Sequence, residues 1–211
     1  MCGFVGYISN VENTMQKTIE NTINQMNKRI VHRGPDEEGY YSDNTIALGF
    51  RRLSIIDIEK GHQPLSYEDE RYWIIFNGEI YNYIELRKEL IIKGYTFNTD
   101  SDTEVIIAAY SAYKEKVVDK LRGMFAFVIW DKVEKLFFGA RDHFGIKPFY
   151  YALEDQGLYV ASEKKAILKV IQDQQLDQVA LQNYLTFQYV PGSETMHQSI
   201  KELLPGHYMT K

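Results

Sequence analysis

Cys2, the only cysteine of the chain, directly follows the initiator methionine. A thiol is a useful nucleophile only as the thiolate, so a free cysteine, with a pKa of about 8.5, needs a base. If Met1 is removed, Cys2 carries a free α-amine with a pKa of about 7.7–8.0, which suits general-base catalysis near neutral pH. Nucleophile and base can then sit on one residue. The alternative is a small apolar residue at the start of a strand, and position alone favours it, because free cysteines are commonly buried.

A second feature with chemical meaning is the Asn77–Gly78 pair in "FNGE". Attack of a thiolate on an amide creates a tetrahedral oxyanion that needs fixed hydrogen-bond donors about 3 Å away. We expect the pair to lie where a strand ends, with Gly78 letting the backbone come close to a substrate. The alternative is a two-residue hairpin turn, for which Asn-Gly is the strongest short signal. A helix signal that starts at Asn82 fits such a hairpin poorly.

The composition is that of a globular protein, with 45% hydrophobic and 25% charged residues among 211, enough for one large domain or two small ones. A net charge of −5 offers no basic surface for a nucleic acid. One cysteine cannot form an internal disulfide, and the Cys/His spacing of zinc sites is missing. No apolar run approaches the roughly 18 residues of a membrane span, and the N-terminus does not look like a signal peptide. We therefore expect a cytoplasmic location, with neither nucleic acid nor membrane as partner.

Hydrophobic periodicity predicts the elements that position these residues. Apolar runs bounded by polar and small residues predict strands at 2–9, 44–50, 71–77, 124–131, 135–142, 148–153 and 158–163. Helical spacing predicts helices at 13–29, 82–95, 101–116, 162–171 and 176–185. The first three helices begin with capping-box pairs, namely Asn13 with Gln16, Asn82 with Glu85 and Ser101 with Glu104. Residues 31–39 are predicted to form a loop and 189–211 irregular chain.

The order of these elements predicts an α+β fold. Strand runs and helix runs do not alternate regularly, which argues against a doubly wound parallel sheet. The runs "WIIF" (73–76) and "FAFVIW" (125–130) are apolar at successive positions, so both faces of those strands should be buried. Two stacked sheets with helices outside would bury them.

Short motifs occur along nearly the whole chain in a specific order. They are "MCGF" (1–4), "HRGPD" (32–36), "RRLSIID" (51–57), "GHQPL" (61–65), "NGEIYN" (77–82), "SDTEV" (101–105), "GMFAF" (123–127), "RDHFGIKPFYY" (141–151) and "ASEKKAI" (161–167). Each alone is weak, but the ordered set closely resembles the N-terminal glutaminase domain of glutamine-hydrolysing asparagine synthetases. These are class II glutamine amidotransferases of the N-terminal-nucleophile hydrolase fold.

The resemblance implies a four-layer αββα sandwich with two mainly antiparallel sheets. It implies that residues 1–190 form the glutaminase domain and that 191–211 connect to a C-terminal synthetase domain absent from this chain. It makes Cys2 the nucleophile, which hydrolyses glutamine to glutamate and ammonia through a glutamyl thioester. The side-chain amide of Asn77 and the backbone N–H of Gly78 would form the oxyanion hole.

The resemblance also implies a pocket that reads both charges of L-glutamine. Arg52, which directly precedes "LSI", would bind the α-carboxylate, as a planar guanidinium can do bidentately. Arg51 is the alternative in register. Backbone groups of Leu53, Ser54, Ile55 and Ile56 would line the pocket.

For the α-ammonium the resemblance points to Asp102, with Glu79 helping. Asp102 lies at a predicted helix start, so capping is its alternative role. Ser101 can supply that cap with Glu104, which leaves Asp102 for the ligand. Asp100 is a nearby carboxylate that the family's "SD" pair does not select.

Cofactors are expected elsewhere. Asparagine synthetases adenylate aspartate in a C-terminal domain with a pyrophosphate loop resembling "SGGLDS", which does not occur here. ATP, magnesium and aspartate would belong to that domain, and this one needs no metal or cofactor. His32 and His143 are expected to be structural, since the α-amine serves as base. The synthetase domain is the expected partner, and a homodimer is compatible. Two alternatives remain, an amidotransferase with another acceptor and a catalytically silent glutamine-binding module.

Overall fold

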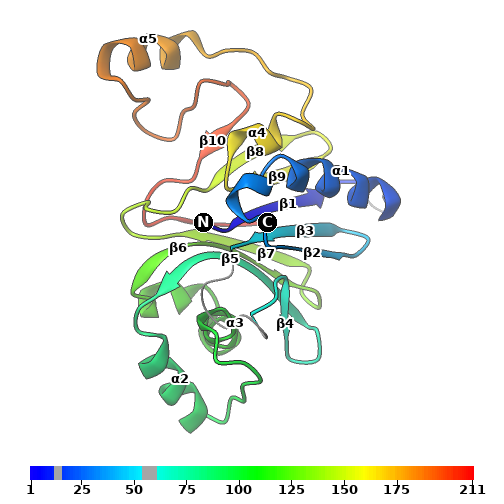
Figure 1. Ribbon diagram of the computed structural model, residues 1–211, viewed down its shortest axis with the longest axis vertical. Helices are drawn as coiled ribbons and strands as arrows, with labels where there is room; N and C mark the ends of the chain where they lie inside the picture. The colour runs from blue at the N-terminus through cyan, green and yellow to red at the C-terminus, as the bar shows by residue number, and fades with distance from the viewer. Residues whose placement is uncertain (12–15, 54–60) are drawn as a thin grey trace.

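The computed structural model describes residues 1–11, 16–53 and 61–211. Two β-sheets lie against each other, and helices cover the outer face of each (Figure 1). Among the described residues, the first sheet holds six antiparallel strands in the order β10-β8-β9-β1-β3-β2. These strands are β1 (Gly3–Ser9), β2 (Glu37–Ser42), β3 (Ile46–Arg52), β8 (Tyr150–Glu154), β9 (Gly157–Ala161) and β10 (Lys201–Glu202).

The second sheet, within the same described ranges, holds five antiparallel strands in the order β11-β7-β6-β5-β4. These strands are β4 (Leu65–Tyr67), β5 (Tyr72–Ile80), β6 (Gly123–Asp131), β7 (Leu136–Arg141) and β11 (Tyr208–Thr210). The long pair β5–β6 forms its centre and runs in register from Tyr72↔Asp131 to Ile80↔Gly123.

Helices α1 (Gln16–Lys28) and α4 (Lys164–Ile167) lie on the first sheet, and α2 (Tyr83–Ile92) and α3 (Asp102–Tyr113) lie on the second (Figure 1). Two 3₁₀ turns, η1 (Val31–Arg33) and η2 (Lys114–Lys120), join strands and helices, and α5 (Gln178–Phe187) stands apart from both sheets. None of the helices in the described ranges is long and apolar enough to cross a membrane.

Three apolar layers fill the spaces between these four layers. Phe4 and Phe137 belong to the layer between the sheets. Ile23 lies in the layer beneath α1 and α4, and Ile106 in the layer beneath α2 and α3. The structure thus confirms the predicted α+β sandwich with two antiparallel sheets and helices outside.

Strand β5 shows why "WIIF" is apolar on both sides. Ile74 and Phe76 point into the layer shared with α3, and Ile75 points into the layer between the sheets. Because neighbouring residues of a strand face opposite sides, burial of both faces requires an unbroken apolar run, and the prediction is confirmed.

Two stretches differ from the sequence prediction. The expected loop at 31–39 contains η1 and runs into the first residues of β2, which pairs with β3 along its length. The expected irregular C-terminal stretch contains β10, which pairs with β8, and β11, which pairs with β7. Short edge strands such as these lack the periodic pattern that identifies a buried strand. A connector role for residues 191–211, with a boundary after residue 190, stays a prediction.

The three predicted capping boxes have different outcomes. The Ser101 hydroxyl accepts the Glu104 N–H at 3.2 Å, which confirms Ser101 as the cap of α3. The Asn82 side chain makes no capping hydrogen bond, so that prediction is wrong. Instead, its amide donates to the Lys120 carbonyl oxygen and accepts the Arg122 N–H, which connects the start of α2 to the segment before β6. Asn13 lies outside the described residues.

Candidate active site

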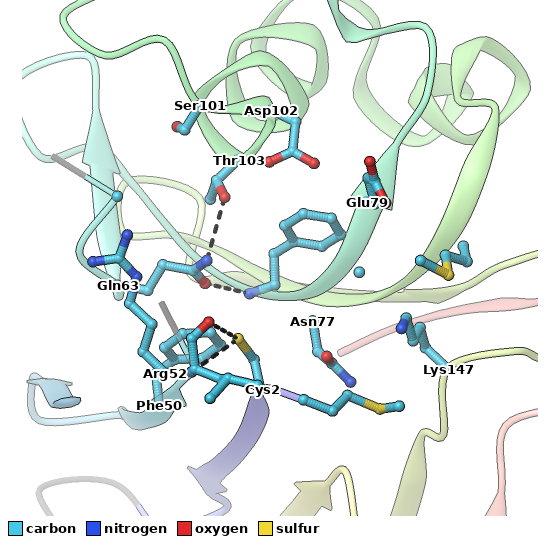
Figure 2. Close-up of a pocket in the computed structure, with 16 residues that line it drawn as sticks. Cys2, Phe50, Arg52, Gln63, Asn77, Glu79, Ser101, Asp102, Thr103 and Lys147 are labelled. Atoms are coloured by element: carbon cyan, nitrogen blue, oxygen red, sulfur yellow. Dashed lines mark hydrogen bonds between the residues drawn. The ribbon is translucent and has the colours of Figure 1, made fainter. Parts of the chain in front are cut away.

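A cavity of about 190 Å³ opens where the start of β1 meets β5 and the start of α3 (Figure 2). Seven of the predicted site residues line it, namely Cys2, Arg52, Leu53, Asn77, Gly78, Glu79 and Asp102. The other three, Ser54, Ile55 and Ile56, lie outside the described residues. Segments far apart in the sequence therefore converge on one pocket, with the single thiol of the chain in its wall.

Cys2 is held in place through both its side chain and its backbone. It directly precedes β1, whose pairing with β3 starts at Gly3↔Arg51. Its sulfur accepts the Leu53 N–H at 3.4 Å and lies 3.6 Å from the Leu53 carbonyl oxygen (Figure 2). Its carbonyl oxygen accepts a hydrogen bond from Arg33 Nε at 2.9 Å, and Arg33 is in turn paired with Glu163 at 3.1 Å. A nucleophile needs this kind of fixed position.

Asn77 places a free donor in the pocket wall. The residue is 2% exposed, and its Nδ2 has no hydrogen-bond partner among the described residues. Figure 2 shows the amide beside Cys2, on the side facing Lys147. An unsatisfied buried donor costs about 1–3 kcal/mol, so this amide is placed to donate to an acceptor that enters the pocket.

Asn77 and Gly78 lie within β5, opposite Ala126 and Phe125 of β6. The hairpin-turn alternative is therefore wrong, and the strand runs on to Ile80 instead of ending at the pair. The need for a glycine at position 78 also differs from the expected one, which was a close approach of the backbone to a substrate. A Cβ at Gly78 would lie 2.1 Å from the Met124 carbonyl oxygen, so the close neighbour is β6.

The alternation of β5 shows where the Gly78 N–H points. Phe125 directs both its N–H and its carbonyl to Asp142, away from β5. The facing Gly78 N–H must then point away from β6, because the pair is not hydrogen-bonded. On that same open side, the Phe76 N–H donates to Gln63 and the Ile80 N–H donates to Asp102. Gly78 supplies the middle amide of the three, at the pocket.

Strand alternation also separates the two candidate arginines. Arg52 lines the pocket, is buried, and pairs through Nη1 with Glu37 Oε2 at 3.1 Å. Arg51 faces the opposite way, donating from Nε to the Asn27 carbonyl oxygen and pairing with Glu38. Of the two, only Arg52 can meet a ligand in this pocket.

Glu37 is a partner of Arg52 that the sequence did not reveal. Burial alone would raise the pKa of Glu37, but hydrogen bonds from His62 and Arg52 outweigh it and lower that pKa. Glu37 is therefore a carboxylate at neutral pH. It holds the guanidinium at the pocket, where a ligand carboxylate would find it already oriented.

Asp102 is the first residue of α3, and its carboxylate is not used for capping. It accepts the Ile80 N–H at 3.0 Å, while Ser101 caps the helix. Burial and, to a smaller extent, the nearby Glu79 carboxylate together raise the pKa of Asp102 to about 6, against the effect of backbone hydrogen bonds, which lower it. By contrast, the side chain of Asp100 is 97% exposed and pairs with Arg87 outside the pocket.

All 211 residues match the model of the glutamine amidotransferase domain family. The chain belongs to this family. It is 56% identical over 210 residues to asparagine synthetase [glutamine-hydrolyzing] 1 of Bacillus subtilis, covering 100% of this chain and 33% of that protein. A putative asparagine synthetase [glutamine-hydrolyzing] of Mycobacterium tuberculosis is 47% identical over 189 residues, covering 83% of this chain and 29% of that one.

The fold of this amidotransferase domain also has solved counterparts. The structure of glutamine phosphoribosylpyrophosphate amidotransferase from B. subtilis, complexed with ADP and GMP, matches with a TM-score of 0.64 at 21% identity. The match covers 80% of this chain and 43% of that one. These comparisons confirm the predicted family and the N-terminal-nucleophile hydrolase fold. The domain spans about a third of the length of the curated relatives it matches.

Gln63 and Lys147 are polar residues of the pocket that were not foreseen as site residues. Gln63 is buried, accepts the Phe76 N–H at 2.6 Å and donates to Thr103 Oγ1 at 3.3 Å, so it joins β5 to α3 (Figure 2). Lys147 is also buried in the lining, and burial, together with the Arg33 charge, lowers its pKa. Both lie in motifs named above, "GHQPL" and "RDHFGIKPFYY", and these motifs were the sequence signal that could have identified them.

No histidine lines this cavity, and all five lie in the described ranges. His32 bonds through Nε2 to Glu163 Oε1 at 2.8 Å, at the protein surface. His143 makes an edge contact with the ring of Phe125. His62 affects the site indirectly, because it bonds to Glu37, the partner of Arg52.

Proposed function

We propose that this amidotransferase domain hydrolyses the side-chain amide of L-glutamine to glutamate and ammonia through a glutamyl thioester on Cys2. One observation carries the proposal. The single thiol of the chain shares a cavity with a buried side-chain amide, Asn77 Nδ2, that has no partner in the described structure. Such a pair suits acyl transfer, in which the nucleophile creates an oxyanion that needs a waiting donor.

The proposed reaction starts when Met1 is removed and the Cys2 nitrogen becomes a free α-amine. This amine takes the thiol proton as the sulfur attacks the amide carbon. Asn77 Nδ2 and the Gly78 N–H donate to the resulting oxyanion. The protonated amine then gives its proton to the leaving nitrogen, the C–N bond breaks and ammonia departs. A water, deprotonated by the same amine, hydrolyses the thioester to glutamate and restores the thiol.

The proposed binding mode uses the two ends of the pocket for the two charges at the glutamine α-carbon. Arg52 binds the α-carboxylate, and Asp102, helped by Glu79, binds the α-ammonium. Backbone groups of Leu53 and of residues 54–56 line the remaining wall. Support comes from the burial of both charged groups, since pairing with a ligand charge is then strong.

For the full-length protein we propose asparagine synthesis, in which a synthetase domain uses the ammonia to convert aspartate with ATP and magnesium. Two similar proteins are named as glutamine-hydrolysing asparagine synthetases, and this chain matches about a third of their length. The single free thiol fits the cytoplasm, where thiols stay reduced. A homodimer remains a prediction that sedimentation of the full-length protein checks.

The test follows glutamate, ammonia and asparagine release by the full-length protein, with its mass measured to establish that Met1 is absent. We expect glutamate with glutamine alone, and asparagine once aspartate and magnesium-ATP are added. Cys2→Ala should abolish glutamate release but still bind glutamine, and a preparation that retains Met1 should be inactive. Full activity with Met1 retained would refute the α-amine as base. Glutamine binding without hydrolysis would favour the silent module, and glutamate without asparagine would favour another acceptor.

A further inference from the structure

Helix α5 exposes an apolar surface that nothing in the described structure covers. Its ten residues, Gln178–Phe187, include no charged side chain, and only Ala180 is buried. Val179 is 67% exposed, Leu185 71% and Phe187 56%. We call the exposed apolar side chains of this region the α5 surface, namely Leu176, Val179, Leu181, Tyr184, Leu185 and Phe187.

The α5 surface also borders a groove. A hollow of about 730 Å³ runs along the helix between Leu181, Leu185 and the preceding turn, with glutamine and threonine as its polar lining. Figure 1 shows α5 at one end of the molecule, beyond α4 and away from both sheets. The helix is fixed at its start, where the Asp177 side chain caps Ala180 and a bridge joins Leu176 to His197. It is therefore presented outward.

A helix of this length that exposes its apolar side chains to water is not expected to be stable without a packing partner. Isolated helices shorter than about 12–15 residues are marginal in water, so most of their stability comes from packing an apolar face. The centres of protein interfaces are depleted in charged residues and enriched in aromatic ones, as α5 is. A membrane surface fits less well, because helices that lie on membranes carry Lys or Arg on their polar face, and α5 has neither.

We propose that the α5 surface docks onto the synthetase domain of the same full-length chain. This rests on the two-domain assignment proposed above. The relatives named above extend for about twice the matched length beyond it, because the match covers 33% of the B. subtilis protein. A domain of that size, tethered to this one, is present at an effective concentration of about millimolar. An apolar contact too weak to hold two separate proteins together would then be occupied most of the time, provided that its Kd is below millimolar.

The test is hydrogen–deuterium exchange of the full-length protein at two concentrations, with Leu185→Glu as the probing variant. Glutamate is a good helix former, so the change removes apolar contact without weakening the helix locally. The control is Ile92→Glu, a comparable aliphatic-to-glutamate change at an 87% exposed position that ends α2. We expect the amides of residues 178–187 to exchange at least about tenfold faster in Leu185→Glu than in the wild type or the control.

Equal exchange of α5 in the wild type and in Leu185→Glu would overturn the proposal. Protection that appears only at the higher concentration would also overturn it, since a second copy would then be the cover. Glutamate release by Leu185→Glu should be unchanged, because the α5 surface does not line the Cys2 cavity. If the wild type released no glutamate while α5 stayed protected, the proposed function would fail and the docking surface would stand.

Discussion

Replacing Asp102 by asparagine should make the ligand-free protein more stable while it loses glutamine binding. The pKa of Asp102 is raised from an ordinary 3.8 to about 6, first by burial and then by Glu79. The raised value means that the folded protein disfavours the carboxylate. At about 1.4 kcal/mol per pKa unit, the penalty comes to about 3 kcal/mol once the group is fully ionised.

The sign of the pH dependence follows from the direction of this shift. At a pH well below its ordinary pKa of 3.8, Asp102 is protonated in both the folded and unfolded states and contributes nothing. Between about pH 4 and 6 the folded state holds more protons, so its stability falls as the pH rises. Asp102→Asn should therefore raise the free energy of unfolding by up to about 3 kcal/mol at pH 8, and by about half of that at pH 5. The asparagine oxygen can still accept the Ile80 N–H, so that hydrogen bond is kept.

Urea denaturation at pH 5 and pH 8 measures this difference. Asp100→Asn is the matched control, because Asp100 lies two residues away with a side chain that is 97% exposed. Its replacement should change the free energy of unfolding by no more than about 0.5 kcal/mol at either pH. A destabilised Asp102→Asn, or a gain of the same size at both pH values, would show that burial does not penalise this carboxylate. In kinetics, the same variant should show a raised KM for glutamine.

Three further predictions concern other parts of the pocket. Because Asn77 is a proposed oxyanion donor, Asn77→Ala should lower kcat for glutamine by about 10²–10³, with little change in KM; Asn27→Ala, which changes a buried asparagine outside the pocket, should leave kcat unchanged. Arg52→Lys loses the planar fork and should raise KM by roughly 10–100-fold, the equivalent of about 1.5–3 kcal/mol; an unchanged KM would place the carboxylate site elsewhere. Ser101→Ala removes the cap of α3 and should lower the free energy of unfolding by about 1 kcal/mol in urea.

The parts of the fold that the sequence predicted are those with strong local patterns. Strand β5 is apolar on both faces because both are buried, and that pattern is visible in four consecutive letters. The cap of α3 is a local contact between Ser101 and Glu104, three residues apart, so it can also be read from spacing. Short edge strands such as β10 and β11 carry no such pattern, because part of each stays exposed.

The details of the site that the sequence missed are contacts between distant segments. Glu37 meets Arg52 across the β2–β3 pair, and Gln63 meets Thr103 over 40 residues. Asn77 and Gly78 have the strongest local turn signal in the chain, yet pairing with β6 keeps them in a strand. Tertiary pairing outweighed local propensity there, and no single sequence could show it.

Three polar groups of the pocket share one property, which is that their surroundings in the ligand-free protein do not complement them. Asn77 Nδ2 is buried without a partner, the Gly78 N–H faces away from its own sheet neighbour, and Asp102 is a carboxylate in a place that disfavours its charge. Asn77 and Asp102 lower the stability of the empty protein, and each of the three groups would be satisfied by one part of a bound glutamine, whose oxyanion and α-ammonium have the complementary charge. Groups that are held unsatisfied need no reorganisation when the reaction starts. The same features that weaken the ligand-free fold are therefore those that would bind glutamine, in the case of Asp102, and stabilise the transition state, in the case of Asn77 and Gly78.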